Sequence, residues 1–115
     1  MDKLDRYRDV IENKLNEFVA LSEGAIGRNT ARYKAVFDRR GDSYLVIREG
    51  WEESVRILSF VIYVEIVNGK ILIQEDWTEH GLARDFEEAG ILKSEIVLGF
   101  QPPYVRPLTD YAAAA

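Results

Sequence analysis

The fold is decided by the stretch VRILSFVIYVEIVNGKILIQED, residues 55–76. In it, two apolar runs flank the pair Asn68-Gly69. Both central positions of a type I′ turn need a positive φ, and Asn followed by Gly adopts that conformation readily. The stretch therefore predicts a two-residue β-hairpin.

This turn also predicts how the two strands pair. Counting outward from it gives three facing pairs: Ile66 with Ile71, Val64 with Ile73, and Ile62 with Glu75. Side chains alternate between the two faces of a strand. The face expected to pack under the helices carries Leu58, Phe60, Ile62, Val64 and Ile66. The other face carries Ile57, Val61, Tyr63 and Leu72, and it is too apolar for open solvent. We expect the C-terminal tail or a second subunit to cover it.

The flanking sequence predicts helices and further strands. Apolar residues recur at helical spacing over residues 2–22 and 79–89, and they alternate over residues 32–37 and 44–48. Residues 96–100 are predicted as a short strand or extended run. Three prolines follow, at positions 102, 103 and 107, and predict an extended arm.

The fold class that follows is α+β, with a single domain over residues 1–115. We expect an antiparallel sheet of about four strands, an N-terminal helix, a helix after the last hairpin, and then the extended C-terminal arm.

Composition narrows the class of protein. The chain has 15 Lys and Arg against 20 Asp and Glu, a formal net charge of −5 and a pI near 4.9. Broad binding to a phosphate backbone needs a basic surplus, so DNA is expected to be contacted weakly or only indirectly. The absence of cysteine excludes disulfides, thiolate metal sites and thiol catalysis. We expect neither a membrane span nor a signal peptide, and we expect a cytoplasmic location.

His80 is the only histidine, and three carboxylates lie near it in sequence: Asp76, Glu79 and Asp85. One hypothesis is a general base or a weak metal site. However, no nucleophile with a specific local signature accompanies it, and a single histidine seldom holds a metal without a defined cluster. The favoured interpretation is an exposed residue in the first turn of the helix. We therefore predict no catalytic, cofactor or metal site.

Two further patterns bear on nucleic acids. Glu12-Asn13-Lys14 matches part of the core motif of restriction-type nucleases, but that motif needs a strand and a second acidic residue to hold Mg²⁺. These residues fall within the predicted N-terminal helix, so the match is interpreted as accidental. Direct DNA binding is a separate hypothesis that rests on five basic residues: Arg28, Arg32, Lys34, Arg39 and Arg40.

Several local signals follow one another along the chain in an uncommon order. They are Asn68-Gly69-Lys70, Ile73-Gln74-Glu75-Asp76, Thr78-Glu79-His80-Gly81, Ala89-Gly90-Ile91, Ile96-Val97-Leu98-Gly99-Phe100, Pro102-Pro103, and Arg106 followed by Thr109-Asp110-Tyr111. With residues 1–8 and Gly50-Trp51, this order and spacing resembles the XisI-like family, the excision controlling factors associated with the fdxN element of heterocyst-forming cyanobacteria. Two positions depart from the family pattern: Trp77 stands where glycine is usual, and Gln101 where histidine is usual.

The resemblance implies a non-enzymatic regulatory or adaptor factor in DNA rearrangement that acts through a XisH-like partner. Two alternatives stay open: an antitoxin-like inhibitor of a nuclease-like partner, and a direct DNA-binding accessory protein. A third hypothesis is an enzyme that uses the carboxylates around His80. The sequence does not support it, because no recognisable set of catalytic residues accompanies this histidine.

The proline-rich arm is the preferred contact element, because a preformed segment loses less entropy on binding and Tyr and Arg are enriched at interface centres. The alternative is that the arm only packs along its own sheet. The residues predicted to bind the partner are Trp51, Tyr63, Tyr104, Arg106 and Tyr111. The apolar second face of the hairpin also predicts a homo-oligomer, of which a symmetric dimer is the simplest form.

Overall fold

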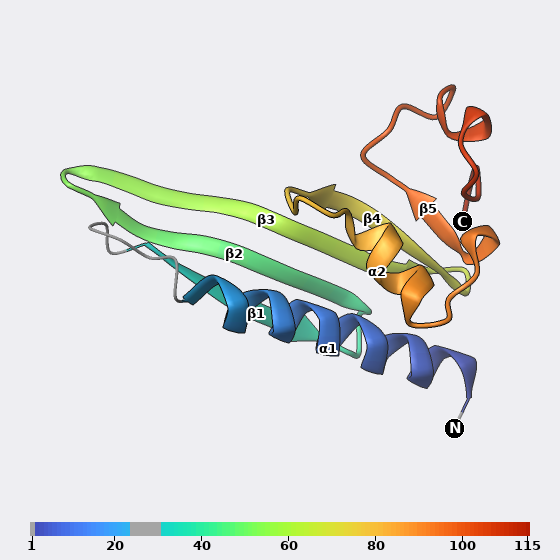
Figure 1. Cartoon of the computed structure of the whole chain (residues 1–115), viewed down its shortest axis with the longest axis horizontal. Helices are drawn as coiled ribbons and strands as arrows, with labels where there is room; N and C mark the ends of the chain where they lie inside the picture. Colours follow the sequence, from blue (N-terminus) through green and yellow to red (C-terminus); the bar gives the residue numbers. More distant parts are fainter. Residues whose placement is uncertain (1, 24–30) are drawn as a thin grey trace.

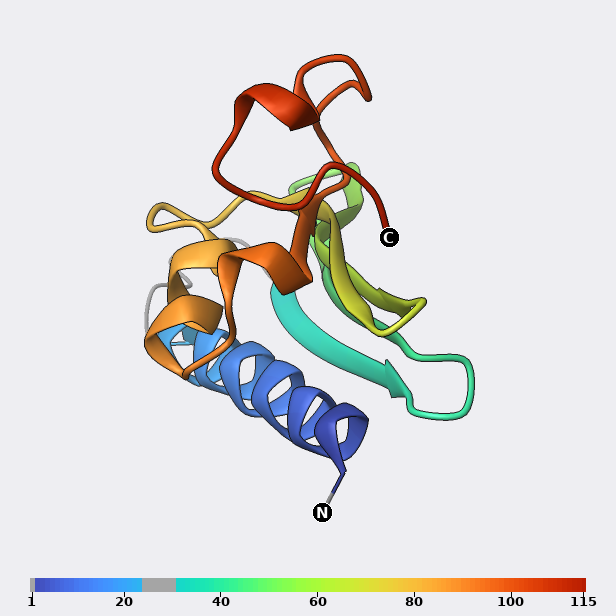
Figure 2. The same ribbon diagram turned by 90° about the vertical axis from the view of Figure 1, so that its right-hand side faces the viewer.

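The computed structural model describes residues 2–23 and 31–115, and in this part of the chain two α-helices lie on one face of a five-stranded sheet (Figures 1 and 2). The elements are helix α1 (Lys3–Glu23), strands β1 (Arg32–Asp38), β2 (Ser43–Glu52), β3 (Val55–Val67) and β4 (Lys70–Asp76), helix α2 (Leu82–Glu88), the 3₁₀ turn η1 (Lys93–Glu95), strand β5 (Ile96–Leu98) and the 3₁₀ turn η2 (Arg106–Leu108). Neighbouring strands follow the order β1-β2-β3-β4-β5. None of the described helices has the length and apolarity needed to cross a membrane.

The core lies between the helices and the sheet. Tyr7, Ile11 and Leu15 recur every four residues along α1 and are almost completely buried. Phe86 of α2 joins the same cluster, which continues onto alternate residues of β2, β3 and β4. This spacing confirms the predicted N-terminal helix, because one apolar stripe of a 3.6-residue repeat meets one face of the sheet.

The predicted hairpin between β3 and β4 is confirmed. Asn68 and Gly69 have φ values of 51° and 78°, which are the two positive values that a type I′ turn requires. The first two predicted pairs are confirmed: Ile66 with Ile71 and Val64 with Ile73. The third is wrong, because the register shifts between Tyr63 and Val64, so that Tyr63 faces Glu75 and Ile62 faces Asp76. The extra residue in β4 is Gln74, whose side-chain amide donates to the carboxylate of Glu65 at 3.0 Å.

A second register shift corrects the predicted core face. Val46 faces Ile62 but Ile47 faces Phe60, so Val61 is an extra residue in β3. An inserted residue moves every side chain beyond it to the opposite face of the sheet. Leu58 and Phe60, which were expected in the core, therefore lie on the face away from the helices, where they are 62% and 57% exposed.

The predicted α+β class is confirmed, but the sheet is mixed rather than purely antiparallel, and it has one strand more than the four that were expected. Strands β1 to β4 are antiparallel, and a fifth strand, β5, pairs in parallel with β4. The segment after β5 was predicted to be extended, but it contains η2 and folds back along β5 (Figure 2). There the Ala112 N–H donates to the Ile96 carbonyl at 2.8 Å. Arg106 closes this loop, because its guanidinium donates to the carbonyls of Gly99 and Gln101.

Gly99 sits where the arm leaves β5, closely packed against β4. A Cβ at this position would lie 2.9 Å from the Ile73 carbonyl oxygen and 2.9 Å from Leu72 Cδ1. We expect Gly99→Ala to lower the free energy of unfolding by roughly 1–3 kcal/mol, because backbone cannot yield as a flexible side chain can. Chemical denaturation followed by circular dichroism measures this. An unchanged midpoint would show that the arm does not depend on this close approach.

Candidate partner-binding surface

The sheet face turned away from the helices carries a group of apolar side chains, which we call the outer face. Its apolar members are Val36 of β1, Leu45 and Ile47 of β2, and Leu58, Phe60 and Tyr63 of β3. Strand pairing places these residues beside one another, on the face opposite the buried Tyr44 and Val46. The rings of Phe60 and Tyr63 lie 6.4 Å apart between centroids. The outer face is therefore an apolar patch on β2 and β3, which Val36 extends onto β1 and beside which Lys34 faces Ile47.

Charged residues border this patch toward the turn between β2 and β3. The carboxylate of Glu49 accepts from the guanidinium of Arg32 at 2.9 Å and lies 4.0 Å from that of Arg56. The hydrogen bond from Arg32 lowers the pKa of Glu49 below its ordinary value, so this carboxylate is ionised at neutral pH. Arg56 also lies over the ring of Trp51, 5.5 Å from its centroid, and Trp51 is about half exposed. An aromatic ring and an arginine beside an apolar patch are typical of interface centres.

Two of the five predicted partner-binding residues lie on this face, and three do not. Trp51 and Tyr63 belong to β2 and β3 on the outer face. Tyr104, Arg106 and Tyr111 belong to the C-terminal arm, which lies beside β5, far from the tip of the β2–β3 hairpin (Figure 1).

Within the arm, the three residues differ in what they contact. Tyr104 is 78% exposed. Arg106 is held by carbonyls of its own arm, and the Tyr111 hydroxyl donates to the Glu87 carboxylate at 2.6 Å. Burial and this hydrogen bond raise the pKa of Tyr111 to about 12. Arg106 and Tyr111 therefore position the arm, and Tyr104 is the member that presents a ring to solvent.

The carboxylate of Asp76 organises the loop that leads into α2. Its Oδ1 accepts from the Thr78 N–H at 2.9 Å and from the Thr78 hydroxyl, and its Oδ2 accepts from the Leu82 N–H at 2.7 Å. The Thr78 hydroxyl in turn accepts from the Gly81 N–H at 3.1 Å. The helix begins at Leu82 rather than at residue 79, because this capped loop occupies residues 77–81. His80 consequently lies before the first turn of the helix, where it is exposed.

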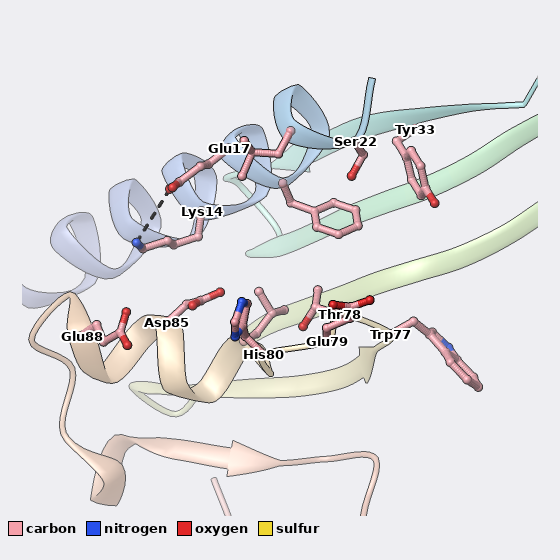
Figure 3. A pocket seen from close by; sticks show the side chains of 13 residues that line it. Lys14, Glu17, Ser22, Tyr33, Trp77, Thr78, Glu79, His80, Asp85 and Glu88 are labelled. Carbon is pink, nitrogen blue, oxygen red and sulfur yellow. Dashed lines mark ion pairs between the residues drawn. The ribbon is translucent and has the colours of Figure 1, made fainter. Parts of the chain in front are cut away.

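An open cleft of about 630 Å³ lies between α1 and this loop (Figure 3). Apolar side chains from both sides line it, among them Phe18, Leu82 and Trp77. His80 and Asp85 line the same cleft, as does the ion pair between Lys14 and Glu17, whose charged atoms are 3.7 Å apart (Figure 3). Burial raises the pKa of Asp85 above its ordinary value. Across residues 2–23 and 31–115, no three His, Asp or Glu side chains are grouped so that they could hold a metal ion.

Two of the residues proposed for direct DNA binding are already paired with carboxylates. Arg39 points to α1, where it pairs with Asp9 at 3.3 Å and Glu12 at 2.8 Å, while Arg32 pairs with Glu49. Glu12 thus lies on a helix as predicted, where it bonds to arginine. Arg28 lies outside the described residues. Charges already neutralised by carboxylates release fewer counterions from DNA, which weakens the case for a phosphate-binding surface.

The family assignment follows from comparison with known proteins. The family model described as XisI protein matches residues 1–113. The chain belongs to the XisI family. A XisI-like protein from Anabaena variabilis ATCC 29413 has a similar solved structure, with 29% sequence identity and a TM-score of 0.87 over 96% of this chain and 99% of that chain. The structure of the fdxN element excision controlling factor XisI from the same organism is also similar, with 33% identity and a TM-score of 0.84 over 98% and 100% of the two chains. No curated protein matches the sequence.

The resemblance seen in the sequence is thereby confirmed, and the family members share this mixed sheet with its two helices over almost their full length. The position that departs from the usual glycine, Trp77, is 74% exposed, and its indole N–H donates to the Glu75 carboxylate at 2.9 Å. This XisI family member thus has a bulky, exposed ring among the residues that line the cleft.

Sequence reasoning missed the central residues of the outer face. Leu58 and Phe60 were assigned to the core, and Val36 and Arg56 were given no role. The exposed ends of β2 and β3 contain an aromatic, an arginine and several aliphatics, which is a usable signal for an interface. The inserted residue Val61 conceals this interface signal in the sequence. Simple alternation counted from the Asn68-Gly69 turn assigns Leu58 and Phe60 to the wrong face of the sheet.

Proposed function

We propose that this member of the XisI family is a cytoplasmic controlling factor for excision of a DNA element, and that it works by binding a XisH-like protein. Family membership and the similarity to an fdxN element excision controlling factor support the process. In this proposal the protein makes and breaks no bonds itself. It presents a surface that holds or restrains the partner.

The observation that carries the proposal is the outer face. Leu58, Phe60 and Val36 are between 40% and 62% exposed, and they lie on the same face of the sheet. Contiguous apolar patches on soluble proteins mark interaction sites. Burial of such a patch releases roughly 25 cal/mol for each Å² of apolar surface removed from water. Arg56, whose guanidinium lies 4.0 Å from the Glu49 carboxylate, can supply a directional contact to a carboxylate of the partner.

The non-enzymatic part of the proposal rests on how the polar groups are used. The Asp76 carboxylate accepts three hydrogen bonds from its own loop, so it is committed to structure. Glu12 is paired with Arg39. His80 is exposed, and burial raises the pKa of Asp85, which lines the same cleft. Catalysis by general acid or base needs groups positioned together with the proton they transfer.

Co-expression with a XisH-like protein, followed by tagged pull-down and sizing, tests the proposal. We expect a stable complex that contains both proteins. A nuclease assay with a DNA duplex distinguishes the two forms of the proposal. If the partner loses nuclease activity in the complex, this protein is an inhibitor. If the partner's activity is unchanged, this protein is an adaptor. If both proteins fold but do not associate, the proposal is wrong. In that case a mobility shift that weakens steeply with salt would identify direct DNA binding.

Tyr104 gives a separate test of the arm as a second contact. Its ring is exposed and held in place by a loop that Arg106 closes. We expect Tyr104→Ala to weaken partner binding by about three- to tenfold, a typical loss for a single ring near an interface rim. Leu108→Ala, also exposed in the arm, is the matched control and should leave affinity unchanged. Equal affinities for wild type and Tyr104→Ala would remove the arm from the interface.

A further inference from the structure

Strand β3 has an edge that no other strand covers. Residues 62–67 of β3 pair with β4, but β4 ends at Asp76, and in the described parts of the chain no strand pairs with residues 55–60 on that side. The last contact before the open part is the hydrogen bond from the Trp77 N–H to the Val61 carbonyl, at 3.1 Å. Figure 1 shows this part of β3 projecting with β2 well beyond β4 and α2. All residues from 55 to 60 except Ile57 are exposed.

The other edges of the sheet are protected, whereas no segment within residues 2–23 and 31–115 pairs with this one. The edge strand β1 carries the exposed cations Arg32 and Lys34, and β5 is bridged by the returning tail at Ala112. Charged side chains and covering segments are the usual means of preventing strands from pairing with other chains. Residues 55–60, VRILSF, contain no proline, no glycine and one charge. Such a segment at an open edge is a template for an added strand.

We propose that the open edge of β3 pairs with the same edge of a second copy, antiparallel about a two-fold axis at Ile57. The sheet of one copy then continues into the sheet of the other. This inference does not depend on the proposed function, because it leaves the outer faces of both copies available to another protein.

Two observations select Ile57 as the centre of this pairing. Pairing must stop before Val61, whose carbonyl already accepts from Trp77, and a two-fold axis at Leu58 would place residue 55 of the second copy opposite Val61. An axis at Arg56 would place two arginines opposite each other, which is unfavourable. With the axis at Ile57, Arg56 lies opposite Leu58 of the second copy, and Val55 lies opposite Ser59. No like charges then face each other.

A second copy can pair with this edge without placing like charges opposite each other. Residues 55–60 carry no carboxylate, so the single cation of each copy meets apolar side chains rather than a like charge. The pairing also brings Leu58 and Phe60 of both copies onto one side of the joined sheet, because residues opposite each other in antiparallel strands share a face. The interface is shorter than a standard protein interface, so we expect the dimer to dissociate on dilution.

A cysteine at the axis tests the pairing directly, because the chain has no cysteine of its own. Opposed residues of antiparallel strands have Cα atoms about 4.5–5.5 Å apart, within the range that a disulfide spans. Oxidised Ile57→Cys should run as a covalent dimer on a non-reducing gel. Val36→Cys, exposed on β1 of the same sheet, should stay monomeric.

A charge at the neighbouring position gives a second test that does not rely on Ile57→Cys folding. Leu58→Lys would place a lysine opposite Arg56 of the second copy, so we expect at least a tenfold weaker dimer by sedimentation equilibrium, with an unchanged circular dichroism spectrum. Val36→Lys should dimerise as the wild type does. A wild-type chain that is monomeric at several hundred micromolar would overturn the proposal. A wild-type dimer that Leu58→Lys leaves intact, or that Ile57→Cys does not crosslink, would place the interface elsewhere and overturn it equally.

Discussion

Replacement of Phe60 by Asp should weaken binding of a XisH-like partner by about 100-fold, which corresponds to about 2.7 kcal/mol. Phe60 is 57% exposed at the centre of the outer face, beside Tyr63 and opposite Ile47. A carboxylate there would have to be buried without a partner when the two proteins associate, and a desolvated charge is costly. The measurement is a titration of labelled partner against the purified variant.

The control for this substitution has to show that the fold is intact. Because Phe60 is largely exposed, the free energy of unfolding should change by less than about 1 kcal/mol. Leu92→Asp, which is 68% exposed between α2 and η1, is a matched apolar-to-acidic change away from the outer face, and it should bind like the wild type. In the proposed dimer, residue 60 does not lie opposite a carboxylate of the second copy. We therefore expect Phe60→Asp to leave the oligomeric state of the free protein, measured as its molar mass, unchanged. Normal affinity of Phe60→Asp would contradict the outer face as the partner site.

Replacement of Asp76 by Ala should lower the free energy of unfolding by about 2–4 kcal/mol, the largest effect expected for a polar residue outside the core. Three donors lose their acceptor at once: the N–H and hydroxyl of Thr78 and the N–H of Leu82. Two of them are backbone groups, and one of these, the N–H of Leu82, is at the start of α2, where a negative charge is also favourable. Urea denaturation followed by circular dichroism gives the change.

Two comparisons make this result specific. Asp76→Asn keeps an oxygen acceptor for Thr78 but loses the charge, so its loss should be intermediate. Glu79→Ala, an exposed carboxylate in the same loop, should change the free energy of unfolding by less than about 0.5 kcal/mol. If Asp76→Ala were as stable as Glu79→Ala, the loop would not depend on this acceptor, and Asp76 would have to be considered for a role other than structure.

Sequence alone predicted the parts of the fold that depend on local rules. The positive φ values of Asn68 and Gly69 and the four-residue recurrence of Tyr7, Ile11 and Leu15 follow from turn chemistry and helical periodicity. Both signals are contained within a few neighbouring residues. They therefore identified the main hairpin, its inner register and the first helix.

The errors lie where pairing between distant segments decides the structure. The inserted residues Val61 and Gln74 have no local signature, because a β-bulge is set by how two strands meet. The parallel strand β5 and the return of the arm depend on contacts such as Arg106 with Gly99 and Ala112 with Ile96. The candidate surface was affected most, since one inserted residue exchanges Phe60 between core and surface.

The most direct test of the account is a calorimetric titration of a XisH-like protein with this XisI family member, both shown to be folded. We predict saturable binding with a dissociation constant in the micromolar range or tighter, and a negative heat-capacity change on association, the mark of apolar surface such as the outer face being buried. No heat of binding at any temperature, with no complex detected by sizing at the same concentrations, would contradict the central claim.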